Sequence, residues 1–287
     1  MASTHRLVAI RWSTRILVWV ALAAALLATA SSPQFPRRGR GLRGAFGATD
    51  FSRPWVYDGK FVFCRLAFRE SFDGDGGGWA VDYPKADLNF PFRLGELTET
   101  PISHNENGDP NHVIVTPTDP HLFQCPFVMM TEVGAAFFDE ADAAKLREYL
   151  TKGGFIWADD FWGEYAWSIW EREIRKVLPA SEFPLVELPM DHPIFNISYL
   201  IRKIPQIPSI DFWFGSGFQT SERGFDSQTP HVRAIENAHG DVIVIITHNT
   251  DFGDAFEREG EDRRYFDRFA AEGYSFGVNV FLYAMTH

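Results

Sequence analysis

The chain has 287 residues, with 27 lysine and arginine residues against 38 aspartate and glutamate residues, and its formal net charge is −11 when histidine is neutral. This balance argues against nucleic acid as a partner, because phosphate binding needs a clustered positive surface. About 230 residues follow the N-terminal region, enough for one α/β domain with a sizeable core.

Residues 1–30 have the pattern of a cleavable secretory signal peptide. Three arginines and no acidic residue precede an apolar run over residues 16–30, which ends in Ala28-Thr29-Ala30. Small residues stand at the two positions that signal peptidase reads, so we expect cleavage after Ala30. The alternative is an uncleaved membrane anchor, although a spanning helix needs about 20 apolar residues. The sequence thus predicts an exported protein of the periplasm or cell envelope. If signal peptidase does not cleave residues 1–30, this segment anchors the protein in the membrane.

Residues 31–58, rich in Pro, Gly and Ser, predict a flexible linker before an α/β domain over residues 59–287. The basic run Arg37–Arg43 is either part of this tether or a patch that touches anionic lipid head groups. Removing residues 1–30 takes away three arginines and no acidic residue, which leaves 24 basic against 38 acidic residues and a net charge of −14.

The two cysteines, Cys64 and Cys125, each lie in an apolar, strand-like segment. An exported chain permits disulfides. Two alternatives fit the sequence equally: two buried free thiols, or one bridge between neighbouring strands. Neither cysteine follows a strand-to-helix turn with a histidine nearby in sequence, which argues against a nucleophile.

Apolar runs early in the chain predict three strands. They cover residues 61–66, 112–116 and 126–130. The clearest helix comes next, because Asp139 is a good N-cap, an apolar stripe follows it, and Gly153 ends the helix. A buried strand over residues 155–158 follows at once. Strand, helix and strand with short links predict a right-handed βαβ crossover and a parallel sheet.

A second helix is predicted over residues 165–178, where Pro179 stops it. Residues 241–247 form the strongest predicted strand, apolar on both faces as a central parallel strand should be. The chain closes with a helix near residues 273–283. Prolines are frequent over residues 180–240, so we expect short strands and loops there.

Polar residues form four clusters along the chain. Two clusters follow predicted strands, where open α/β sheets place their ligand crevices; they are Asp159 with Asp160, and His248, Asn249 and Asp251. The third cluster lies in a long loop after the first strand and consists of Asp82, Tyr83, Asp87 and Asn89. The fourth lies in a proline-rich segment and consists of Asp191 and His192.

Each cluster also has a structural interpretation. Asp159 or Asp160 could cap a helix that starts near Trp162, or the pair could share a metal ion or a proton. Asp191 could simply stabilise a turn before Pro193, or His192 could act as a ligand or base.

The glycine-rich run from Asp73 to Gly78 does not fit a phosphate-binding loop, and its two aspartates would repel phosphate. Asp73 and Asp75 could hold calcium, but the twelve-residue loop pattern is absent, so a mobile surface loop is the expectation. The sequence has no G-x-S-x-G, H-E-x-x-H or C-x-x-C signature.

Six blocks, in order, resemble the DUF4159 domain, a bacterial domain of unknown function placed in the class I glutamine amidotransferase-like superfamily. The resemblance covers roughly residues 60–286. The blocks are Phe63–Leu66; Asp82–Pro84 with Ala86–Phe90; Arg93–Thr98; Leu146–Phe161; Leu188–Phe195; and Gly277–Asn279 with Tyr283.

The resemblance implies a flavodoxin-like three-layer α/β sandwich with a mostly parallel central sheet. Glutamine amidotransferases of this class carry a nucleophilic cysteine after a central strand, whereas the matching region here reads Asp159-Asp160-Phe161. Glutaminase activity is therefore not expected. Relatives of the fold that lost the cysteine often act as binding or assembly modules, so the resemblance implies such a role. The genomic company of the family implies an envelope-associated assembly.

These observations lead to a first hypothesis, a non-catalytic envelope domain that binds a small ligand or a protein partner and needs no cofactor. The candidate ligand-binding residues are Asp82, Tyr83, Asp87, Asn89, Asp159, Asp160, Asp191 and His192. The oligomeric state is left open.

The alternative is a metal-assisted hydrolase in which Asp160, His192 and Asp82 hold a divalent ion that activates water. Nearby aromatic residues would then line a sugar-binding cleft: Trp79, Tyr83, Trp157, Phe161 and Trp162. A third hypothesis is purely structural, with the aromatic residues in the core and the polar motifs as caps and turns.

Overall fold

The computed structural model describes residues 57–287. The predicted signal peptide (residues 1–30) and nearly all of the predicted linker (residues 31–58) lie outside the described residues. Within the described part of the chain, no helix has both the length and the apolar character to cross a membrane.

A seven-stranded sheet forms the centre of the domain, in the order β3-β1-β4-β6-β9-β8-β7. The first five of these strands are parallel, β8 runs antiparallel to β9, and β7 runs antiparallel to β8. The strands are β1 (Phe63–Leu66), β3 (His112–Val115), β4 (Phe127–Met130), β6 (Phe155–Ala158), β7 (Leu185–Glu187), β8 (His231–Glu236) and β9 (Val242–His248). A separate ribbon pairs β2 (Arg69–Glu70) with β5 (Ala136–Phe137).

The parallel strands, counted along the chain, have the spatial order 2-1-3-4-5, which is the flavodoxin-like order. The predicted α/β sandwich with a mostly parallel sheet is therefore confirmed. Strands β1, β4, β6 and β9 are buried on both faces, as the continuous apolar runs predict.

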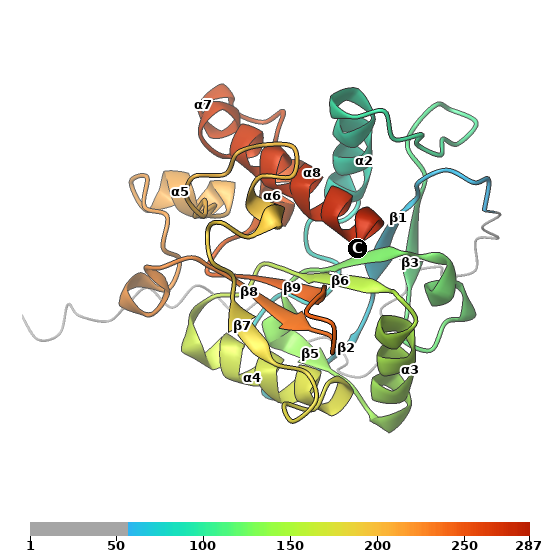
Figure 1. Cartoon of the computed structure of the whole chain (residues 1–287). Coiled ribbons are helices and arrows are strands. Elements are labelled where there is room, and N and C mark those ends of the chain that lie inside the picture. Colours follow the sequence, from blue (N-terminus) through green and yellow to red (C-terminus); the bar gives the residue numbers. More distant parts are fainter. Residues whose placement is uncertain (1–56) are drawn as a thin grey trace, which may run out of the picture. The chain divides into compact units, whose positions relative to one another are not determined.

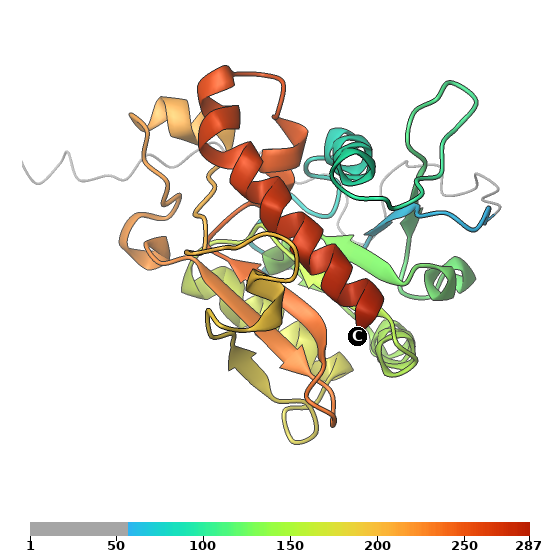
Figure 2. The ribbon, with the colours of Figure 1, turned by 45° about the horizontal axis from the view of Figure 1, so that its top comes forward.

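Helices cover both faces of the sheet (Figures 1 and 2). One face carries α2, α5, α6, α7 and α8, and the other carries α3 and α4. The helices are α2 (Lys85–Leu97), α3 (Glu140–Thr151), α4 (Gly163–Val177), α5 (Ile210–Gly215), α6 (Phe252–Glu257), α7 (Arg263–Tyr265) and α8 (Ala271–Thr286). Short turns of 3₁₀ helix are η1 (Pro120–Gln124), η2 (Val133–Ala135), η3 (Pro193–Phe195) and η4 (Gly224–Ser227), and η5 (Phe266–Ala270) is a π-helical turn.

The predicted βαβ unit is present as β4, α3 and β6. Asp139 caps α3 through a capping box with Asp142, and Gly153 follows the helix with φ +97°. The structure corrects the expectation of a long loop after the first strand, because residues 85–97 form α2. This helix forms although Pro91 lies inside it, since Phe90 and Leu94 are fully buried against the sheet.

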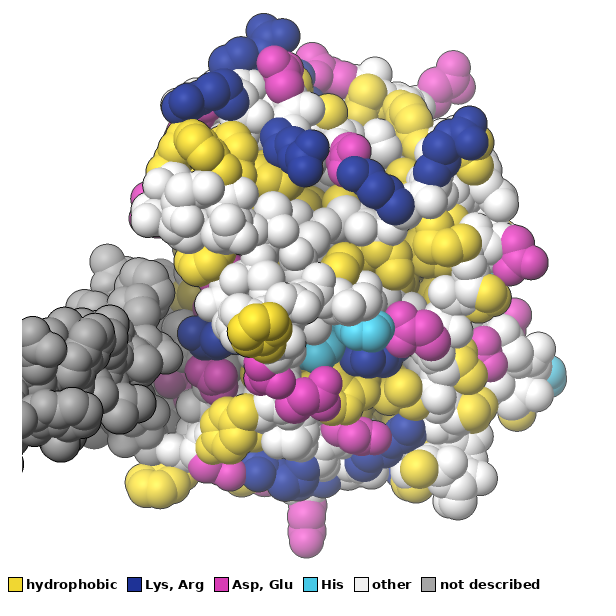
Figure 3. Space-filling view, turned by 90° about the vertical axis from the view of Figure 1, so that its left-hand side faces the viewer, with side chains coloured by type: hydrophobic (Ala, Val, Ile, Leu, Met, Phe, Trp, Pro, Cys, Tyr) yellow, Lys and Arg dark blue, Asp and Glu magenta, His cyan; other side chains and the backbone are white. Residues whose placement is uncertain are grey.

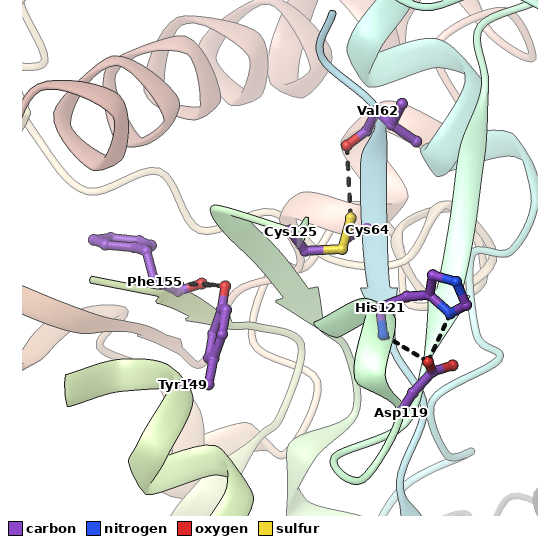
Figure 4. The surroundings of a disulfide bond; sticks show 7 residues. All are labelled: Val62, Cys64, Asp119, His121, Cys125, Tyr149 and Phe155. Carbon is purple, nitrogen blue, oxygen red and sulfur yellow. Dashed lines mark hydrogen bonds and ion pairs between the residues drawn. A yellow bond between two sulfur atoms is a disulfide. The ribbon is translucent and has the colours of Figure 1, made fainter. Parts of the chain in front are cut away.

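Cys64 and Cys125 form a disulfide, which resolves the open alternatives in favour of a bridge (Figure 4). Cys64 lies on β1, and Cys125 lies two residues before β4, the neighbour of β1 in the sheet. The bond closes a loop across a sequence separation of 61 residues. A cysteine pair in a disulfide has no free thiolate to attack a substrate.

We expect the Cys64→Ala/Cys125→Ala variant to lose about 2 to 4 kcal/mol of unfolding free energy, because the bond restricts the unfolded chain. Urea unfolding of the oxidised protein and the double variant measures this loss. The wild type in reducing agent is the control and should unfold like the variant. Equal midpoints with and without the bond would contradict the prediction.

Candidate functional site

Five carboxylates meet at the carboxyl edge of the parallel sheet, and we call them the acidic cluster. One oxygen each from Asp82, Asp160 and Asp251 lies within 4.8 Å of the other two. The same holds for Asp82, Asp254 and Glu257, so Asp82 belongs to both triads. The four aspartates are buried and Glu257 is half-buried.

The cluster lies at the place where the strand order of the sheet reverses. Asp82 comes from the segment after β1, and Thr131 directly follows β4, the strand on the other side of that switch point. The Thr131 hydroxyl donates to Asp82 Oδ2 at 3.1 Å and contacts Asp160 Oδ2 at 3.4 Å. Ligands of open α/β sheets bind at such a switch point.

The backbone brings Asp82 and Asp160 together through unusual conformations. Both residues have left-handed φ values, 65° for Asp82 and 55° for Asp160. A Cβ atom on Gly253, in the first turn of α6, would lie 2.2 Å from Asp82 Oδ2. Only glycine therefore lets α6 approach this carboxylate so closely.

Helix α6 supplies the other three carboxylates. Asp251 caps the helix by accepting a hydrogen bond from the Asp254 backbone N–H at 2.7 Å. Asp254 Oδ2 accepts from the Ile210 N–H, and Arg258 contacts its other oxygen at 3.3 Å. The spacing of three residues from Asp251 to Asp254 to Glu257 places these side chains on one side of the helix.

Burial and mutual repulsion raise the pKa values of this cluster. Burial, followed by the charge of Asp254, raises the pKa of Asp82 to about 7. Burial raises the pKa of Asp254 to about 7 as well. The pKa values of Asp160 and Asp251 rise well above the ordinary value, first through burial and then through the neighbouring carboxylates. Such a site favours either bound protons or a bound cation.

The donor set of the acidic cluster suits a hard cation. It offers only carboxylate oxygens, the ligands preferred by Mg²⁺, Ca²⁺ and Mn²⁺, and no histidine or cysteine.

The raised pKa values predict a pH-dependent stability in chelator. Asp82 and Asp254 hold protons in the folded state up to about pH 7, whereas the unfolded chain releases them near its ordinary value of 3.8. Their stabilising contribution is complete below that ordinary value and is lost as pH rises through the folded pKa. We therefore expect the melting temperature in chelator to fall between about pH 6.5 and 8.5.

Differential scanning fluorimetry across this interval checks the slope. Burial lowers the pKa of His248 to about 3, so this residue adds no opposing slope above pH 6.5, the ordinary pKa of histidine. Saturating Mg²⁺ should flatten the slope because the ion replaces the protons. A melting temperature that rises with pH in chelator would contradict the prediction.

Asp159 caps a helix, although not the helix expected from the sequence. Its Oδ2 accepts from the backbone N–H groups of Phe252 and Gly253 at the start of α6, at 2.8 and 3.0 Å. The start of α4 is held instead by Asn249, whose Oδ1 accepts from the Gly163 N–H. The expected capping of α4 by Asp159 or Asp160 is therefore wrong.

Asp87 and Asn89 lie outside the acidic cluster and hold the segments around it in place. Asp87 forms a fully buried ion pair with Arg65, whose Nε lies 2.9 Å from both carboxylate oxygens. Arg65 also donates to the carbonyls of Trp79 and Val81, and so fixes the segment that carries Asp82. Asn89 donates to Phe256 O at 2.8 Å and thereby ties α2 to α6.

Asp191 and His192 lie away from the acidic cluster. The His192 ring lies tilted against the Tyr283 ring, with centroids 5.4 Å apart, and the Tyr283 hydroxyl accepts from the backbone N–H of Val242 at the amino end of β9. The His192 Nδ1 accepts a hydrogen bond from the Ile194 N–H. Asp191 is exposed to solvent. The proposed metal set of Asp160, His192 and Asp82 is therefore not assembled, because the histidine is at the opposite edge of the sheet.

Other residues from the predicted clusters also have structural partners. Tyr83 is half-buried and its hydroxyl lies 3.3 Å from His112 Nε2. His248 Nε2 lies 3.1 Å from Gly163 O, and Arg233 donates to its other ring nitrogen. The aromatic residues expected to line a sugar cleft are buried, apart from half-buried Tyr83: Trp79, Trp157, Phe161 and Trp162.

The glycine-rich loop is anchored by ion pairs. Arg172 pairs with Asp73 at 2.8 Å and Arg223 pairs with Asp75 at 3.2 Å. These partners occupy the carboxylates that calcium would need. A Cβ on Gly76 would lie 2.3 Å from Glu132 Oε2, so the loop packs against that side chain.

The sequence reasoning missed Asp254, Glu257 and Glu132. Glu132 follows β4 with a left-handed φ of 52°, and burial raises its pKa to about 8. Asp254 and Glu257 could have been found from their spacing. Together with Asp251 they place an acidic residue at every third position after the strongest predicted strand.

Two comparisons with known proteins bear on the chain. A family model described as Domain of unknown function (DUF4159) matches residues 63–285. No curated protein matches the chain. The matched range contains the whole acidic cluster.

Proposed function

From the premise that this chain belongs to the DUF4159 family, a domain family of unknown function, we propose that it is an exported binding module that holds a divalent cation in its acidic cluster. The observation that carries the proposal is the pair of carboxylate triads that share Asp82. In the role proposed here, the cation presents a positive charge at the switch point, where a small ligand or an envelope protein could bind.

Charge balance supports a cation in the cluster. Five carboxylates converge there, while Arg65, whose charge reaches Asp82, already forms a buried ion pair with Asp87. Arg258 contacts Asp254 and also pairs with Glu257 and Glu261. Uncompensated buried charge is costly, and a divalent ion would remove that cost without protonation.

Export is supported by two features. The arginines and the apolar run of residues 1–30 match a signal peptide. The Cys64–Cys125 bridge fits an oxidising compartment beyond the cytoplasm.

Elemental analysis of the purified protein, before and after chelation, tests the proposal. Isothermal titration with Mg²⁺, Ca²⁺ and Mn²⁺ then gives the stoichiometry. The Asp160→Asn variant removes a ligand from the first triad only, and Glu257→Gln removes one from the second only. We expect saturable binding that at least one of these variants weakens. No saturable binding of any of the three ions would overturn the proposal.

A second candidate is a metal-assisted hydrolase, favoured by the sharing of Asp82 between the triads. Two-metal hydrolases hold ions about 3.5 to 4 Å apart with ligands in common. This candidate requires two ions per chain and metal-dependent hydrolysis of p-nitrophenyl phosphate or p-nitrophenyl glycosides. One bound ion per chain without any hydrolysis would rule out the hydrolase and leave the binding module as the proposed function. The buried aromatic residues give the carbohydrate version no support.

A further inference from the structure

Basic and apolar side chains share one part of the surface, over α5, α7 and the start of α8. Figure 3 shows lysine and arginine side chains gathered over the upper part of that face, with hydrophobic side chains between them. We call this the basic–apolar surface and define it by Leu200, Arg202, Phe214, Phe218, Arg264 and Arg268. It contrasts with a chain whose formal net charge is −11.

The apolar members are large and solvent-exposed. Leu200 is 63% exposed and Phe218 is 54% exposed. The Phe214 and Phe218 rings both contact the ring of Trp213, with centroids 5.0 and 4.9 Å apart. Exposed apolar groups held on an ordered base mark interaction surfaces.

The basic members retain charge for a partner. No carboxylate in the described part of the chain lies within ion-pair distance of Arg202 or Arg268. Arg264 pairs with Asp262 on the exposed surface, and its guanidinium also lies 4.9 Å from the Phe214 ring centroid. Exposed pairs of this kind are weak and exchange readily with other anions.

A groove beside Leu200 joins the two kinds of side chain. Its lining includes the apolar Ile201 and Ala271 and the basic Arg202 and Lys203. The acidic Glu272 also lines it and lies 3.9 Å from Lys203 Nζ, which leaves Arg202 as the unpaired cation of the groove among the described residues. Apolar surface bordered by arginine and lysine matches the chemistry of a lipid interface, where phosphates lie next to acyl chains.

We propose that the basic–apolar surface docks on an anionic lipid bilayer. Arg202 and Arg268 bind lipid phosphates, and Leu200 and Phe218 enter the interface beside them. Guanidinium groups suit this role because their fork of donors matches phosphate oxygens. The inference does not depend on the acidic cluster, so its success or failure is independent of cation binding.

An environment-sensitive dye, attached to the full chain at one cysteine, tests which surface faces the bilayer. The Leu200→Cys variant places the dye on the basic–apolar surface. Ser168→Cys is the matched control, because Ser168 is exposed on α4 in the opposite helical layer. The native cysteines are paired and do not compete for the dye. Vesicles of phosphatidylglycerol and of phosphatidylcholine are the two probes.

We expect a blue shift of the dye emission with phosphatidylglycerol vesicles at position 200 and none at position 168. Adding Arg202→Gln and Arg268→Gln should weaken this response at least about tenfold in lipid concentration. Free phosphate at the same phosphate concentration should give no shift, which separates a bilayer from an isolated anion.

Several results would overturn the inference. They are no shift at position 200, equal shifts at both positions, or equal shifts with the two lipids. A shift without vesicles that grows with protein concentration would assign the surface to a second copy of the chain instead.

Discussion

The Asp82→Asn variant is expected to lose divalent-cation binding at both carboxylate triads. Asp82 is the one residue common to them, so its replacement removes a ligand from each. Changes in residues that merely orient ligands already cost about 10 to 100-fold in metal affinity, so loss of a shared direct ligand should cost on the order of 100-fold or more. Isothermal titration of Mg²⁺ or Mn²⁺ measures the loss.

The same variant should behave differently in chelator. Asparagine keeps the shape of the side chain but removes one buried carboxyl from a set of mutually repelling groups. We expect the cation-free variant to melt at or above the wild-type temperature near pH 8, where the wild-type carboxyls are most ionised. Asp191→Asn is the matched control, since Asp191 is exposed and outside the cluster. Unchanged affinity in Asp82→Asn would remove the acidic cluster as the cation site.

The Arg65→Met variant should lose about 3 to 5 kcal/mol of unfolding free energy, because it leaves the buried Asp87 carboxylate without its partner. Both side chains of this pair are fully buried. Methionine fills much of the space of the aliphatic part of arginine, so the loss reports the charge more than a cavity. Urea unfolding at neutral pH measures it.

A double variant separates charge from packing. Arg65→Met/Asp87→Leu replaces the pair by apolar groups, and it should recover most of the lost stability. Arg65 also donates to the carbonyls of Trp79 and Val81, so this double variant should still bind cations less well than the wild type. A double variant no more stable than Arg65→Met would show that packing, and not the buried charge, sets the loss.

Local sequence patterns predicted much of the fold. The capping box at Asp139 and the positive φ at Gly153 depend on residues close in sequence, and the structure has both. The apolar runs of β4, β6 and β9 were equally visible, because strands buried on both faces need such runs. Helix α2 was missed because Pro84 and Pro91 indicate a break, which the burial of its apolar face overcomes.

The candidate site was less visible because its contacts join distant segments. Asp159 follows β6, but the helix it caps begins at Phe252, 93 residues later. His192 stood in a segment with no strong pattern, so nothing in the sequence indicated which edge of the sheet it would reach. Asp82 and Asp160 could be named as candidates, whereas their meeting at Thr131 depends on the strand order of the sheet.

The bridge between Cys64 and Cys125 has a consequence for a chain that a protease has cut. Asp82 and Arg65 both lie between the two cysteines, as does the exposed turn over residues 104–109. A single cut in that turn would leave two fragments that stay covalently joined, one carrying Asp82 and the other carrying Asp160 and α6. A nicked molecule would thus keep every carboxylate of the acidic cluster in one particle, and only reduction would part them.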